Sequence, residues 1–228
     1  MDSIRQVSTR AIAVTASASL LAFPCLVITA NLVQRDSYSA AREAVSNLAL
    51  GRAGWLMTLA FLSLGIGTLL LALVVRRLVD RAIVAPIALA AAGCTTLLSA
   101  VFQTDAEGAG STLHGTIHLA LGLGSFVLVI VATIAGTIAL LRSGSRRGIG
   151  IASGVWTVAA IGGMVATFVL PDSLFGVGQR IFLAAAVGWM LTLCLFATRT
   201  ARDQHMGRHG SAVFSVGTRS DAAAAPKL

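Results

Sequence analysis

Apolar residues occur in this sequence as long uninterrupted runs rather than at alternating positions. About 20 consecutive apolar residues form a helix that crosses the roughly 30 Å hydrocarbon core of a bilayer. The predicted spans are 11–33, 53–75, 82–102, 113–141, 149–170 and 176–198. An open sheet cannot span lipid, because its edge amides would lack hydrogen-bond partners. The pattern therefore predicts an all-α, polytopic membrane protein, a bundle of six transmembrane helices.

The runs divide the chain into a short N-terminal segment, a membrane domain and a tail. Residues 1–10 come first, and the run 11–33 is longer than the 7–15 apolar residues of a signal peptide, so we expect it to be retained as a span. The six spans occupy 11–198. Residues 199–228 are polar and rich in Gly, Ser and Ala, which predicts a disordered tail.

The composition agrees with a membrane protein and argues against a nucleic-acid partner. Apolar residues make up 56% of the chain and charged residues 11%, whereas soluble domains carry about 25% charged residues. The net charge of +8 comes from arginines in short clusters between apolar runs. That distribution is typical of cytoplasmic loops and not of a nucleic-acid-binding face.

The basic residues also predict the orientation. Of the 17 Lys and Arg residues, only Arg35, Arg42, Arg52 and Arg180 fall on one side of the predicted bundle. The other 13 flank the termini and the two loops on the opposite side. Because basic loops stay in the cytoplasm, we expect a multi-pass protein of the cell (plasma) membrane with both termini cytoplasmic.

The first outer loop carries polar side chains in a helical spacing. Apolar residues in 39–50 recur every three or four positions, which predicts a short interfacial helix. Glu43 and Asn47 share one face of that helix, and Ser46 lies three positions from Glu43. We interpret Glu43 as a candidate general base, Ser46 as a second candidate catalytic residue and Asn47 as a binding residue.

The second outer loop leads into two histidines four positions apart. His114 and His118 would lie on one helix face, and Asp105 precedes them in the loop. Two histidines and a carboxylate can hold zinc or another divalent metal. The alternative is that both histidines form interhelical hydrogen bonds, with Glu43, Ser46 or Asp105 as partners.

The third outer loop precedes Gln179 and Arg180, which begin the last span. A single arginine at this depth should reach the membrane surface or pair with an anion. Candidate partners are Asp172, Asp105, Glu43 and a lipid phosphate, onto which a guanidinium fits well. A structural ion pair closing the outer end of the bundle is the alternative to a binding role for Gln179 and Arg180.

Several of these motifs resemble a family of bacterial membrane proteins known as domain of unknown function 998. The resemblance is carried by Tyr38 with the segment Glu43-Ala-Val-Ser-Asn-Leu-Ala-Leu, Gly54-Trp55, Phe102-Gln-Thr-Asp105, His114-Gly-Thr-Ile-His118, Gly178-Gln-Arg-Ile and Trp189. It covers about residues 10–198. It implies a six-span protein and supplies no activity.

Three kinds of function fit the polar residues on the outer side. The first is a lipid-binding protein or a metal-dependent lipid hydrolase that takes a lipid or another amphiphile from the outer leaflet. Ser46, Asp105, His114 and His118 are similar to the site of membrane hydrolases such as the alkaline ceramidases, although a third histidine is missing. The second is a non-catalytic scaffold, accessory subunit or sensor. A small-solute transporter is disfavoured, because the span centres hold almost no ionisable residues.

Overall fold

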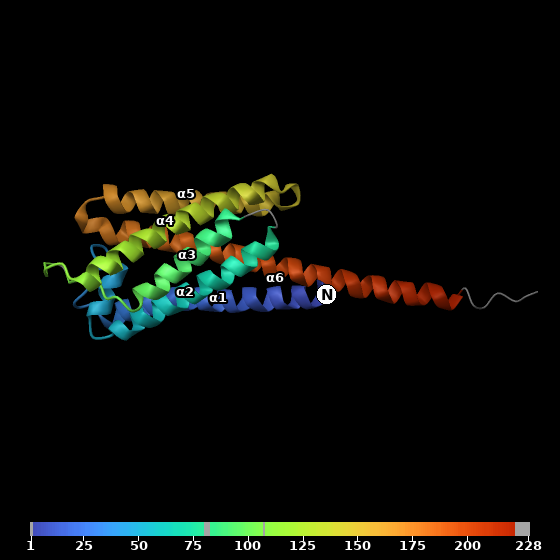
Figure 1. Ribbon diagram of the computed structural model, residues 1–228, viewed down its shortest axis with the longest axis horizontal. Helices are drawn as coiled ribbons and strands as arrows, with labels where there is room; N and C mark the ends of the chain where they lie inside the picture. The colour runs from blue at the N-terminus through green and yellow to red at the C-terminus, as the bar shows by residue number, and fades with distance from the viewer. Residues whose placement is uncertain (1, 80–82, 107, 222–228) are drawn as a thin grey trace, which may run out of the picture.

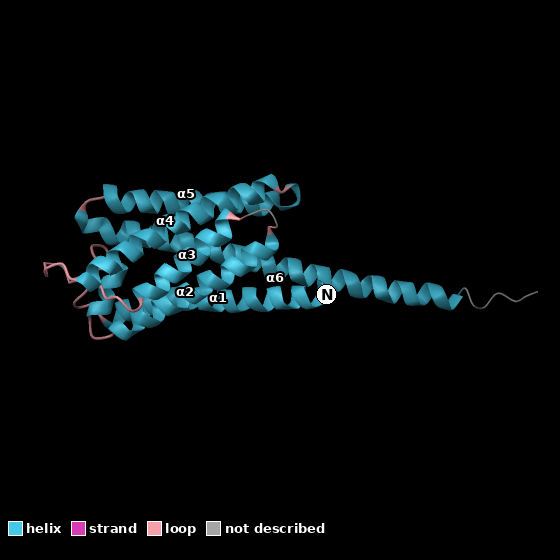
Figure 2. Ribbon diagram, viewed as in Figure 1, coloured by secondary structure: helices cyan, strands magenta, loops and turns pink. Residues whose placement is uncertain are grey.

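The computed structural model describes residues 2–79, 83–106 and 108–221, with side chains described for residues 9–200 within these ranges. This part of the chain is helical and contains no strand, which confirms the all-α prediction (Figures 1 and 2). The α-helices are α1 (Asp2–Val33), α2 (Gly54–Leu78), α3 (Val84–Ser99), α4 (Leu113–Arg142), α5 (Arg147–Val169) and α6 (Phe175–Asp221). Short 3-10 helices are η1 (Val45–Leu50), η2 (Gly144–Arg146) and η3 (Asp172–Leu174).

The helices overlap the six predicted spans, but they differ in length. By length and composition, α1, α2, α4, α5 and α6 can each cross a membrane. The remaining helix, α3, has 16 residues and extends over about 24 Å at 1.5 Å per residue. The predicted span 82–102 is longer than this helix, because the chain turns away from helical geometry after Ser99. The described residues therefore form a polytopic bundle with five helices of spanning length and one shorter apolar helix.

Each helix packs against its neighbours in the sequence, and α1 also packs against α6, so the six helices form a closed ring. The ring holds its larger buried cluster around Leu71, Leu89 and Trp189 and a second one around Tyr38, Leu48 and Met57. Sequential packing follows from the short connections between the runs, which make consecutive helices antiparallel neighbours. The arrangement brings residues from all six helices toward one common interior.

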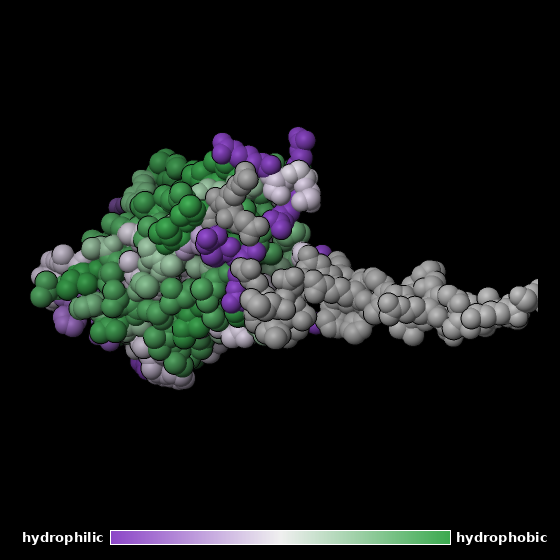
Figure 3. All heavy atoms as spheres, turned by 45° about the vertical axis from the view of Figure 1, so that its right-hand side comes forward, coloured by the Kyte–Doolittle hydropathy of each residue, from purple (hydrophilic) through white to green (hydrophobic). Residues whose placement is uncertain are grey.

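The outer surface of the ring is apolar. Large hydrophobic side chains such as Ile87, Val155 and Phe168 are more than 60% exposed, and Figure 3 shows hydrophobic residues over the visible face of the bundle. Exposing such a surface to water costs roughly 25 cal/mol of free energy per Å² of apolar area, whereas contact with lipid tails carries no such cost. The surface thus supports the membrane assignment independently of helix length.

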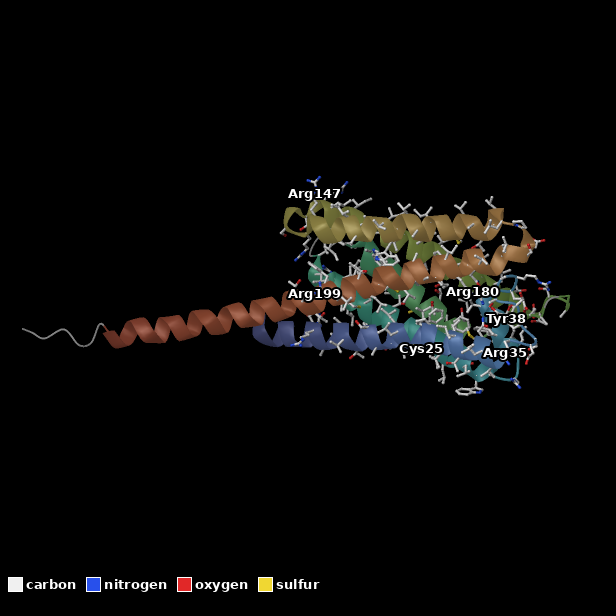
Figure 4. All side chains as sticks on the ribbon, turned by 180° about the vertical axis from the view of Figure 1, so that it is seen from behind. Cys25, Arg35, Tyr38, Arg147, Arg180 and Arg199 are labelled. Carbon is white, nitrogen blue, oxygen red and sulfur yellow. The ribbon has the colours of Figure 1, made fainter. Side chains whose placement is uncertain are left out.

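Two ends of the bundle are distinguished by the residues that Figure 4 labels. The Tyr38 end carries Arg35, Tyr38 and Arg180, and the Arg147 end carries Arg147 and Arg199 (Figure 4). At the Arg147 end, α4 and α5 are joined by buried hydroxyls. Thr137 Oγ1 lies 2.6 Å from Ser153 Oγ and 3.0 Å from Thr157 Oγ1, and the fully buried Trp189 donates from Nε1 to Ser153 Oγ at 2.6 Å. This network closes the bundle at that end.

One predicted segment looks different in the structure. An α-helix was expected within 39–50, but the chain forms turns up to Glu43 and then the 3-10 helix η1. The turns arise because the Glu43 carboxylate accepts from the backbone N–H of Ser39 at 2.7 Å, and its own N–H donates to the Ser39 carbonyl. The disordered tail over 199–228 stays a prediction: α6 is described to Asp221, and residues 222–228 lie outside the described residues.

Candidate functional site

The first loop is fastened to α6 through three polar side chains. Gln179 is buried, and its Oε1 accepts from the buried backbone N–H of Val45 at 2.7 Å. Arg180 donates from Nη1 to the carbonyl of Glu43 at 3.1 Å and from Nη2 to the Tyr38 hydroxyl. The hydroxyl in turn donates to the carbonyl of Ala44 at 3.0 Å or to that of Glu43 at 3.3 Å. The hydrogen bonds between this loop and α6 thus join residues that are 134 or more positions apart in the sequence.

The guanidinium also lies over the Tyr38 ring, with Cζ 5.6 Å from the ring centroid. Burial raises the pKa of the Tyr38 hydroxyl, while the hydrogen bond and the charge of Arg180 act in the opposite direction. The tyrosine therefore stays neutral at physiological pH and supplies hydrogen bonds and a π-face to Arg180. The expected ion pairs of Arg180 with Asp172, Asp105 or Glu43 are not formed, because its partners here are neutral oxygens.

Asp105 holds Thr112, the N-cap residue of α4, in place. Its two carboxylate oxygens accept from the Thr112 hydroxyl at 2.6 Å and the Thr112 backbone N–H at 2.9 Å. The Thr112 hydroxyl then accepts from the N–H of Gly115 at 3.1 Å, as an N-cap residue does. These hydrogen bonds to Thr112 lower the pKa of Asp105. The carboxylate packs so closely that a Cβ on Gly115 would lie 1.9 Å from it, which explains the glycine.

The two histidines have separate surroundings. His118 is buried, its Nδ1 lies 2.7 Å from the carbonyl of Phe102, and its ring meets the Phe61 ring edge-on at 5.8 Å. His114 is exposed and lies beside the Phe102 ring at 5.4 Å. Among the described residues, no group of three or more His, Cys, Asp or Glu side chains could hold a metal ion. The expected zinc site of Asp105, His114 and His118 is not assembled, because each residue serves a local contact.

A central cavity of about 330 Å³ opens within the ring toward the Tyr38 end. All six helices and η1 contribute to its walls, which are mostly apolar and include Phe23, Phe126, Val129, Phe182 and Met190. On α6 the lining extends from Phe175 to Met190, about 22 Å along the helix axis. The lining is therefore about three-quarters as long as a hydrocarbon core of roughly 30 Å is thick.

Several polar side chains line the mouth of the central cavity. Ser46, Asn47, Thr104, His118 and Gln179 line this part. The structure describes no hydrogen bond from the side chains of Ser46, Asn47 or Thr104, and none from the amide nitrogen of Gln179. None of the lining residues is Asp, Glu, Lys or Arg. The mouth thus offers several free neutral donors and acceptors above an apolar interior, the usual composition of a small-molecule pocket.

The structure separates the residues that the sequence suggested as one site. Ser46, Asn47, His118 and Gln179 share the central cavity. Glu43 faces a shallower hollow with Tyr38, and its carboxylate is held by Ser39 rather than directed at Ser46. Arg180 lines a second apolar groove between α1 and α6.

Sequence reasoning missed the hydroxyls inside the spans, which also line the central cavity. Thr96 and Ser125 are buried and lie 3.0 Å apart across α3 and α4. The hydroxyl oxygen of Thr68, on α2, lies 3.7 Å from the Met190 sulfur. Threonine and serine within apolar runs at similar depth are the signal that could have located the cavity, because such hydroxyls often bond between helices in lipid.

One comparison with known proteins adds to this geometry. The family described as "Protein of unknown function (DUF998)" matches residues 16–196. The chain belongs to this family. The match extends from α1 to α6 and includes all the residues that line the central cavity. It confirms the resemblance seen in the sequence motifs. No curated protein and no solved structure matches the chain.

Proposed function

We propose that this DUF998 protein binds a neutral amphiphile, which places its polar head at the mouth of the central cavity and its apolar chain inside. The observation that carries the proposal is the pairing of uncharged, unbonded polar side chains at the mouth with an apolar interior lined by all six helices. A head group with hydroxyls or an amide would bond Ser46, Asn47 and Gln179. A charged head would lose its hydration without gaining a counter-charge.

The amphiphile would come from the membrane through a side opening between α4 and α5. The two helices are joined at the Arg147 end and diverge toward the Tyr38 end (Figure 1). Leu123 and Phe168 line the cavity and are also exposed on the outside of the bundle. Gly122 of α4 also lines the cavity and has no atom within 4 Å of the position that a Cβ would take.

The topology belongs to the same proposal. The basic residues of the Arg147 end favour the cytoplasm, so α3 completes six spans, η1 lies at the outer interface, and the cavity faces the outer leaflet of the plasma membrane. A membrane-impermeant maleimide should label Arg35→Cys but not Arg147→Cys on intact cells. Labelling of Arg147→Cys alone would contradict this orientation.

Binding without catalysis is the function that the contacts support. Ser46 has no described base within hydrogen-bond distance, and the Glu43 carboxylate bonds the loop itself. A nucleophile requires an adjacent base for activation. The loop–α6 contact also fits the alternative of a scaffold or sensor, in which the loop conformation would report whether the cavity is filled.

The binding proposal can be tested with two glycines of the same helix. Gly122 lines the cavity, whereas Gly124 does not, and both have open space around the Cβ position. A photoreactive monoacylglycerol should label the purified wild type and Gly124→Trp equally, and excess unlabelled monoacylglycerol should suppress the labelling. Gly122→Trp should lower the labelling several-fold. Equal, non-competable labelling of all three proteins would refute amphiphile binding in the cavity.

A further inference from the structure

We infer that the groove between α1 and α6 is a second lipid site, which binds the acyl chain of an anionic phospholipid while Arg180 binds its phosphate. This site adjoins the central cavity, with which it shares the wall residues Phe23, Val45, Leu183 and Val187, and it takes an anionic rather than a neutral head group. The groove has a volume of about 550 Å³ and lies at the Tyr38 end of the two helices. Its apolar walls include Phe23, Val27 and Ile28 of α1 and Leu183 and Leu191 of α6.

Charge is the argument for the occupant. Arg180 is the one formally charged residue among those lining the groove. No carboxylate forms an ion pair with it in the described part of the chain, where the ion pair of Arg35 with Asp36 is the one recorded. A partly buried guanidinium at the edge of the hydrocarbon is costly without an anion. The phosphate diester of an anionic phospholipid supplies a charge at this depth that no ammonium group of the same head group balances, unlike the phosphate of phosphatidylcholine.

The guanidinium has donors left for that phosphate. Arginine carries five N–H donors. Nη1 donates to the carbonyls of Glu43 and Gly176, and Nη2 donates once, to the Tyr38 hydroxyl. No acceptor is described for Nε or for the second Nη2 hydrogen. Nε and Nη2 lie on the same edge of the guanidinium fork, and such an edge can bind two oxygens of a phosphate side by side.

The fork is also held in place before any lipid arrives. The Tyr38 ring lies under the guanidinium at 5.6 Å, and the two carbonyl contacts fix Nη1. An immobilised arginine loses little further side-chain freedom on binding. Below it, Ala184 lines the groove and is exposed, so the small side chain leaves room for an acyl chain between the helices.

The test compares phospholipids bound to the full-length protein in native mass spectra from detergent micelles. Phosphatidylglycerol should bind more tightly than phosphatidylcholine. Arg180→Ala should weaken phosphatidylglycerol binding by about 10- to 100-fold, the usual effect of losing a charge-assisted pair of hydrogen bonds. Arg35→Ala, which removes an exposed arginine at the same end, should leave binding unchanged.

A second pair of variants tests the acyl chain without disturbing the loop that Arg180 holds. Ala184→Trp fills the groove and should abolish the preference for phosphatidylglycerol, whereas Ile181→Trp, on the exposed face of α6 and outside the groove, should not. Glycerophosphoglycerol, which has the same phosphate but no acyl chains, should fail to compete. Equal binding by Ala184→Trp and wild type, or by phosphatidylcholine and phosphatidylglycerol, would overturn the inference. Neither result depends on the central cavity, because monoacylglycerol labelling there is measured separately.

Discussion

The contact between Gln179 and Val45 allows a quantitative prediction about what holds the first loop on the bundle. Replacing Gln179 by Leu keeps a side chain of similar size but makes it apolar and removes the oxygen that accepts from the Val45 N–H at 2.7 Å. Val45 is 3% exposed, so water cannot replace the lost acceptor. A buried donor left without a partner costs about 1–3 kcal/mol.

That cost corresponds to about a 5- to 150-fold increase in the population of the open loop, since 1.4 kcal/mol is a factor of ten. Unfolding in mixed detergent and sodium dodecyl sulfate, followed by circular dichroism, should show the lower stability of Gln179→Leu. Limited proteolysis within the loop should accelerate by the same factor. Gln179→Glu, which keeps an oxygen acceptor, is the matched control.

An unchanged proteolysis rate in Gln179→Leu would refute the reasoning. It would mean that the Val45 N–H already has another acceptor, and that the loop is held by its apolar residues Val45 and Leu48 alone. Equal acceleration in Gln179→Glu and Gln179→Leu would indicate that burying a carboxylate at this position costs as much as losing the acceptor.

Two further predictions concern the ends of the bundle. The pKa of Asp105 is lowered by its bonds to Thr112, so its stabilising effect should be complete above the ordinary pKa of about 3.9 and disappear as the pH falls through the lower, folded value. Melting curves between pH 6 and pH 3 should show this loss of stability in wild type and not in Asp105→Asn. A wild-type curve parallel to that of Asp105→Asn would contradict a stabilising contact between Asp105 and Thr112. Thr112→Val should lower the stability by about 0.5–2 kcal/mol through loss of the N-cap. At the other end, Ser153→Ala leaves the Trp189 Nε1–H buried without its acceptor. It should destabilise the protein by about 1–3 kcal/mol in the same unfolding assay. A change in stability within ±0.5 kcal/mol, typical of exposed positions, would show that Trp189 is held by packing alone.

The helices were predictable from the sequence because lipid imposes them. A backbone inside hydrocarbon must satisfy its hydrogen bonds within the segment, so each long apolar run could adopt one structure. The length of α3 was harder to predict. The apolar run continues through Ala100 and Val101, but their N–H groups form turn hydrogen bonds at the end of the helix. The hydropathy of the sequence does not reveal where the helix ends in such turns.

The candidate site was only partly predictable, because residue type indicates chemistry but not partners. His114 and His118 have the right spacing for a metal, yet His118 Nδ1 lies at hydrogen-bond distance from a carbonyl 16 positions away. Asp105 was interpreted as a ligand although Thr112, directly before an apolar run, is itself an N-cap signal. For Arg180 the sequence offers a carboxylate or a lipid phosphate as partner, and its neutral partners within the chain depend on how the loop folds over α6.

The central claim is that an amphiphile occupies the cavity, and photolabelling with residue-level mapping tests it most directly. A monoacylglycerol carrying its photoreactive group at the end of the chain should label residues deep in the cavity, such as Val129 and Met190. Labelling confined to the lipid-facing side chains of Val155 and Val158, which are exposed on α5, would show that the molecule only surrounds the protein and would contradict the account.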